Sequence, residues 1–209
     1  MTALRLAFAA LVTLSAAAAL AATDDAPYDL LFKNGTLDDI DRDTTLVYDR
    51  TVTNALAPDA ATRDTGRIEL TFEDSDVEAA LLTFRQDGKH RVLGEFPASV
   101  GNPMILYFVE TVVRDMAESA GGSPFYIRNR VKESLVAPAE VETGGGVSTV
   151  TLRPFEGDPN ADRMQGFDDL ALTVTMSEDT PGWYSELKAE VPGEDGTPVY
   201  ASTIALTED

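Results

Sequence analysis

Four oxygen-bearing residues between positions 158 and 169 have the spacing of a calcium-binding loop. Asp158, Asn160 and Asp162 would stand at ligand positions 1, 3 and 5, and Asp169 at position 12. Calcium takes six to eight oxygen ligands from a loop that turns sharply at position 6, where glycine is needed. Here Arg163 stands at that position, and aspartate replaces the usual bidentate glutamate. The segment therefore predicts either a weak calcium site or a turn built around Asp158 without a metal.

The composition removes most catalytic chemistry. The chain has no cysteine and a single histidine, which excludes disulfides, thiol nucleophiles and cysteine-based zinc sites. That histidine, His90, lies between Lys89 and Arg91, with no carboxylate nearby in the sequence to orient it as in a catalytic triad. Neither a hydrolase nucleophile elbow nor a glycine-rich phosphate-binding pattern occurs. We expect a non-enzymatic protein, and a hydrolase with paired carboxylates is the enzymatic alternative.

One dense basic patch occurs in this chain. Arg128, Arg130 and Lys132 would share one face of a strand, whereas on a helix only Arg128 and Lys132 would share a face. Such a patch can recognise a carboxylate or a lipid head group. The alternative is that these cations pair with the surplus acidic side chains of the same molecule.

Apolar and aromatic side chains complete the predicted ligand site. The run from Met104 to Val109 would form either a lid over an apolar cavity or a core helix, and Trp183-Tyr184 would either line a ligand mouth or close one end of the core. The residues predicted to bind ligand are Met104, Tyr107, Phe108, Phe125, Tyr126, Arg128, Arg130, Trp183 and Tyr184.

The first 21 residues have the pattern of a secretory signal peptide. Arg5 precedes the apolar run from Leu6 to Leu20, and Ala19-Leu20-Ala21 has the small-x-small pattern of a cleavage site. The apolar run is shorter than the roughly 20 residues that span a bilayer, and no cysteine follows to carry a lipid anchor. We expect cleavage near Ala21, a single domain over residues 22–209, and a periplasmic or secreted location.

The charge balance restricts the partners. The chain has 16 Lys+Arg against 36 Asp+Glu, a formal net charge of -20. Such a surface repels nucleic-acid phosphates and anionic membranes. We expect no nucleic-acid partner and no membrane anchor, and we expect either an apolar or amphipathic small molecule or an envelope protein.

The sequence pattern predicts a mainly antiparallel sheet of about eight strands. Ile68, Leu70 and Phe72 alternate with polar residues, and Asp87-Gly88 predicts a two-residue hairpin turn. Glycine-rich and proline-rich turns separate the later strands without intervening helices. The predicted strands cover residues 44–53, 67–73, 77–86, 90–96, 147–153, 170–176, 184–191 and 199–206.

The middle of the chain predicts a helical hairpin over residues 102–136. Asn102-Pro103 is a helix start, and Gly121-Gly122 is a helix stop. Ser123-Pro124 then starts a second helix with an apolar repeat at Ile127, Val131 and Leu135, although a strand over 125–131 is the alternative.

The predicted fold class is therefore α+β, a curved sheet or half-barrel with a helical hairpin packed on one face. This order of elements is similar to that of secreted half-barrel carriers of lipids and lipoproteins, without a shared motif. The predicted function is to hold an apolar or amphipathic ligand between the sheet and the helix at 102–119, with the basic patch selecting its polar group. The alternative is an envelope structural or assembly factor that binds a protein through an open sheet edge.

Overall fold

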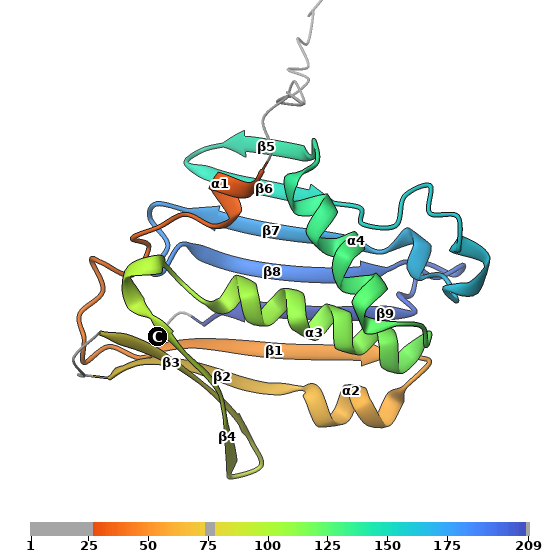
Figure 1. Cartoon of the computed structure of the whole chain (residues 1–209). Coiled ribbons are helices and arrows are strands. Elements are labelled where there is room, and N and C mark those ends of the chain that lie inside the picture. The colour runs from red at the N-terminus through yellow and green to blue at the C-terminus, as the bar shows by residue number, and fades with distance from the viewer. Residues whose placement is uncertain (1–26, 74–77, 208–209) are drawn as a thin grey trace, which may run out of the picture.

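The fold is a single antiparallel sheet with helices packed on one face (Figure 1). A computed structural model describes residues 27–73 and 78–207. The predicted signal peptide therefore lies outside the described residues. Within the described ranges, no helix is long and apolar enough to cross a membrane.

Nine strands make up the sheet that the described residues form, in the order β4-β3-β2-β1-β9-β8-β7-β6-β5. Every neighbouring pair is antiparallel. The sheet is open, and β4 and β5 are its two edges. The strands are β1 (Leu46–Asn54), β2 (Gly66–Glu73), β3 (Ala79–Gln86), β4 (Lys89–Pro97), β5 (Glu140–Gly144), β6 (Val147–Leu152), β7 (Ala171–Ser177), β8 (Tyr184–Val191) and β9 (Tyr200–Leu206).

Two long helices cover one face of the sheet. Figure 1 shows α3 running nearly along the strands and α4 crossing them. The α-helices are α1 (Tyr28–Leu31), α2 (Pro58–Asp64), α3 (Met104–Ser119) and α4 (Pro124–Val136). Three short 3₁₀ turns cover Ala98–Val100, Ala161–Arg163 and Phe167–Asp169.

The alternation of side chains along each strand explains the two layers. In β1, Leu46, Tyr48 and Val52 are buried on the helix-covered face, whereas Asp49 and Thr51 are exposed. The stripe on α3 that meets them is almost fully buried at Met104, Phe108, Val112 and Met116, and the stripe on α4 is buried at Ile127, Val131 and Leu135. Burial of these apolar side chains is the main force that holds the helices on the sheet.

The predicted fold class is confirmed, with three differences in detail. The helical hairpin at 102–136 is present, so the strand alternative for residues 125–131 is wrong. The sheet has nine strands in the described residues rather than about eight, because β5 pairs with β6 across the Gly144–Gly146 turn. The short helices α1 and α2 were also not predicted. The hairpin turn is as predicted, with positive φ at both Asp87 and Gly88.

Candidate functional site

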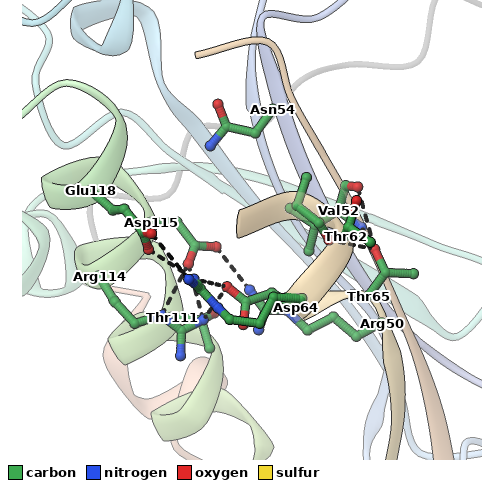
Figure 2. Close-up of polar contacts among 12 residues, drawn as sticks. Arg50, Val52, Asn54, Thr62, Asp64, Thr65, Thr111, Arg114, Asp115 and Glu118 are labelled. Atoms are coloured by element: carbon green, nitrogen blue, oxygen red, sulfur yellow. Dashed lines mark hydrogen bonds and ion pairs between the residues drawn. The ribbon is translucent and has the colours of Figure 1, made fainter. Parts of the chain in front are cut away.

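Arg50 is a buried charge at the centre of the helix-covered face. It lies on β1, and its side chain has no solvent exposure. Its Nη2 donates a 2.8 Å hydrogen bond to Asp115 Oδ2 on α3, and its Nη1 donates one of 3.3 Å to Tyr107 Oη. The hydroxyl of Tyr200 donates to the same Asp115 oxygen at 2.9 Å. Figure 2 shows Asp115 facing Arg50 across the helix–sheet interface.

Further ion pairs continue this cluster toward the surface. Arg114 Nη2 lies 3.0 Å from Asp115 Oδ1 and 3.1 Å from Asp64 Oδ2. Arg63 pairs with both Asp64 and Glu118, with a closest distance of 2.8 Å in each case. Burial by itself would raise the pKa of Asp64, but the hydrogen bond from Arg63 and the charge of Arg114 outweigh burial and lower that pKa below its ordinary value. The cluster therefore anchors α2 and α3 to the sheet as a charge-balanced unit.

Asn102 fixes the start of α3. Its Oδ1 accepts a 3.0 Å hydrogen bond from the Met104 amide, and its Nδ2 donates to Tyr48 Oη at 2.9 Å and to the Gly182 carbonyl at 2.8 Å. Gly182 has a φ of +73°, and a Cβ there would lie 2.7 Å from Leu46 Cδ1, so only glycine fits this close approach. At the predicted helix start, the buried Asn102 side chain therefore joins α3 to β1 and to the turn before β8.

A second polar cluster holds the start of α4 against the loop after β6. Asp158 is buried, and its carboxylate accepts hydrogen bonds from the Tyr126 hydroxyl at 2.6 and 2.8 Å and from the Asn160 amide at 2.8 Å. Arg130 Nε lies 2.9 Å from Asp158 Oδ2, although its N–H is not aligned with that oxygen. Burial by itself would raise the pKa of Asp158, but the hydrogen bonds from Tyr126 and Asn160 outweigh it and lower that pKa.

These contacts frame an open groove of about 480 Å³ at the turn between α3 and α4, which we name the hairpin groove. Its apolar lining consists of Met116, Ala120, Gly121, Gly122, Ile127 and Met164. Its polar lining consists of Ser123, Tyr126, Asn160 and Arg163. Ligand sites commonly have volumes of roughly 300–1,000 Å³, with an apolar lining and few polar groups. The hairpin groove has both properties.

Most of the apolar residues predicted to bind ligand lie in the core instead. Met104, Phe108 and Tyr184 are buried, and the Tyr184 hydroxyl donates to the Leu31 carbonyl. Trp183 is also buried, and its Nε1 donates to the Leu30 carbonyl at 3.1 Å. These contacts hold the α1 segment on the sheet. The predicted ligand site between the sheet and α3 is therefore occupied by side chains at these positions.

The remaining aromatic residues of the prediction have different surroundings. Tyr107 is half-buried and contacts Arg50. Phe125 is 76% exposed at the start of α4, and its neighbour Tyr126 is 36% exposed and lines the hairpin groove. Within the predicted ligand set, Tyr126 is the residue that the structure places in this groove.

The basic patch is largely paired within the molecule. Arg128 forms two hydrogen bonds with Glu110, at 2.8 and 2.7 Å, and the hydrogen bond to Glu110 raises the pKa of Arg128. Arg130 pairs with Glu133 at 2.9 Å in addition to Asp158. These pairs match the alternative of intramolecular pairing that the sequence left open.

The calcium pattern is split by the structure. The Asp158 carboxylate faces Tyr126 and Arg130, and Asn160 donates to both Tyr126 and Asp158. Asp162 is exposed, and Asp169 stands in a separate 3₁₀ turn. Among the described residues, no three His, Cys, Asp or Glu side chains cluster so as to hold a metal ion. The arrangement around Asp158 has the Asx-turn contacts of the non-metal alternative, and calcium binding stays a prediction.

Sequence reasoning missed Arg50, Asp115 and the two groove residues Arg163 and Met164. The position of Arg50 in the sequence could have indicated its burial, because it falls on the same side of β1 as Leu46, Tyr48 and Val52. Arg163 was named from the sequence only as a departure from the calcium pattern, and Met164 gave no signal. Both lie between β6 and β7, where a 3₁₀ turn ends at Arg163, and nothing in their local sequence indicates that the α3–α4 turn is their neighbour in space.

Neither a protein-family model nor a curated protein sequence matches this chain.

Proposed function

We propose that this protein is a non-enzymatic periplasmic binding protein that holds an amphipathic small molecule in the hairpin groove. The observation that carries the proposal is the groove itself, with an apolar lining that includes Met116 and Met164 and a polar edge that includes Arg163. Methionine side chains adapt to irregular apolar ligands because they are unbranched and polarizable. The periplasmic location follows from the predicted signal peptide.

Among the described residues, a second apolar hollow lacks the unpaired cation that the hairpin groove has, which is why we place the ligand in the hairpin groove. It has about 420 Å³ and lies at the start of α3, where Tyr28, Val100 and Leu106 are exposed. The cation that lines it, Lys33, already pairs with Glu178 and lies 4.3 Å from the centre of the Trp183 ring. The hairpin groove combines an apolar lining with a cation that has no such partner in the described residues.

The test is binding of a neutral ten-carbon amphiphile, decanoyl-N-methylglucamide, below its critical micelle concentration. The protein would carry ¹³C-labelled methionine methyl groups, and binding would be followed by NMR. Met116 and Met164 line the groove, whereas Met104 and Met176 are buried elsewhere in the core and serve as internal controls. We expect saturable shifts of the first pair only.

Chain length and a groove-filling substitution make this test specific. The octanoyl homologue has two methylenes fewer, and each buried methylene contributes about 0.8 kcal/mol, so this homologue should bind about fifteenfold more weakly. Ala120→Phe should fill the groove and abolish the shifts, whereas Val100→Phe, at the second hollow, should preserve them. Absence of binding, or equal loss in both variants, would overturn the proposal.

A further inference from the structure

We infer that the ligand of the hairpin groove carries an anionic head group, which Arg163 binds at the polar edge of the groove. The inference rests on the proposed function and names the class of ligand: a single-chain amphiphile with a carboxylate or a chemically similar anion at one end.

Arg163 is one of five lysine and arginine side chains in the described residues that form no ion pair there, and it is the one of the five that lines the hairpin groove. Ten of the lysine and arginine side chains in the described residues form ion pairs with acidic side chains. Arg163 is exposed and forms no ion pair with any residue that the structure describes, although the chain has 36 Asp+Glu. A guanidinium in that state can form a charge-assisted, two-pronged contact with a carboxylate.

The other polar groups of the groove do not favour a cationic ligand. Tyr126 and Asn160 are already bonded to Asp158, and that carboxylate is buried and paired with Arg130, which also pairs with Glu133. Asp162, the neighbour of Arg163 in the chain, is exposed and is not among the residues that line the groove. The cation that faces the groove is therefore not matched by an anion of the groove lining.

Two helix ends meet at the hairpin groove, the C-terminus of α3 and the start of α4. Ser123 precedes α4 and lines the groove, and its side chain makes no capping hydrogen bond. The first backbone N–H groups of a helix carry a partial positive charge. The last carbonyl groups of α3 carry the opposite partial charge, and Ala120 at that end also lines the groove, so the two helix ends offset each other. The full positive charge at the groove edge is therefore that of Arg163, while the lining at Met116 and Met164 stays apolar.

The experiment compares three probes with matched ten-carbon chains: sodium decanoate, neutral decanoyl-N-methylglucamide and decyltrimethylammonium bromide. Each is titrated below its critical micelle concentration, with the Met116 and Met164 methyl shifts as readout. We expect decanoate to bind about tenfold more tightly than the neutral probe. We expect the cationic probe to bind this groove most weakly, in spite of the net charge of -20.

Two substitutions test the role of Arg163. Arg163→Gln should remove the roughly tenfold preference for decanoate, so that decanoate and the neutral probe bind this variant with similar affinities. Arg153→Gln is the matched control, because Arg153 is also exposed without an ion pair in the described residues but lines a different hollow. This control should change neither affinity.

The outcomes separate this inference from the proposed function. If the neutral probe shifts both methyls and decanoate binds no more tightly than the neutral probe, the groove binds amphiphiles but does not select an anionic head group, and this inference is wrong. If the cationic probe binds best at these methyls, the overall charge governs the site and the inference is also wrong. If no probe shifts the groove methyls, the groove binds no amphiphile, and the proposed function is wrong together with the inference that rests on it.

Discussion

Arg50 is an arginine at an inward position of a central strand, which is costly unless its charge is met. Asp115, Tyr107 and Tyr200 surround it with a carboxylate and two hydroxyls, and the Asp115 carboxylate is in turn shared with Arg114. Burial raises the pKa of Tyr200, and the charge of Asp115 acts in the same direction. Tyr200 therefore stays a neutral donor to that carboxylate.

Removing Arg50 should destabilise the fold strongly. Arg50→Met leaves a buried carboxylate without its main partner, and breaking a buried pair in this way costs about 3–5 kcal/mol. The free energy of unfolding, measured by urea denaturation with circular dichroism, is the check. The double variant Arg50→Met/Asp115→Leu removes both charges and should lose less stability than the sum of the single variants. Additive losses would show that the two side chains do not act as a pair.

The lowered pKa values of Asp64 and Asp158 predict acid sensitivity. Both lie below the ordinary 3.8 in the folded protein, so the unfolded state binds more protons as the solution is acidified. The stabilisation is present above the ordinary value and is lost as pH falls from about 5 through the folded pKa values. Urea denaturation across this range should show a slope that is smaller in Asp64→Asn and in Asp158→Asn. An unchanged slope in both variants would contradict the pKa assignment.

At the scale of elements, the periodicity of the sequence predicted those strands whose apolar pattern is contained within the strand itself. The strand at 184–191 coincides with β8, because Leu187, Ala189 and Val191 alternate with polar residues within the segment itself. β5 escaped prediction because Glu140–Gly144 contains one apolar side chain, Val141, and exists through pairing with β6. Pairing between segments is not encoded in the periodicity of either one.

The candidate site was less predictable than the fold for a related reason. Tyr126 was singled out, but its neighbours Met164 and Arg163 come from a loop that is 37 or more residues away in the chain. Met104 and Phe108 were proposed as ligand contacts, because a sequence does not show whether an apolar helix face meets a ligand or a sheet. Side-chain packing against the sheet decided that question.

The start of α3 makes a prediction at this scale. Asn102→Ala removes the cap of the Met104 amide and two donor contacts, and should lower the free energy of unfolding by about 1–3 kcal/mol. Asn102→Asp keeps an acceptor for the cap but places a carboxylate against the Gly182 carbonyl. It should therefore also destabilise the fold at neutral pH. A fully stable Asn102→Asp would show that the cap alone matters.

The whole molecule is a sheet covered on one face and open at both edges. Open edges invite pairing with other chains, and proteins block this with charged residues, bulges and short strands. β5 is short and carries Glu140 and Glu142. β4 is longer and carries Lys89 and Arg91, and its pairing with β3 is interrupted by a register shift at Leu82/Thr83. Both edges thus have features that oppose association.

The β4 edge should become a pairing surface when its charges are removed. Val92 on this strand is already 59% exposed, so Lys89→Val/Arg91→Val would place β-branched residues at positions 89, 91 and 92 of this edge and remove its two formal charges there. We expect a concentration-dependent rise in mass by size-exclusion chromatography with light scattering. Lys188→Val is the control, because it removes a lysine from β8, an interior strand with both neighbours in place. If the double variant keeps the mass of the parent protein, the bulge rather than the charge protects this edge.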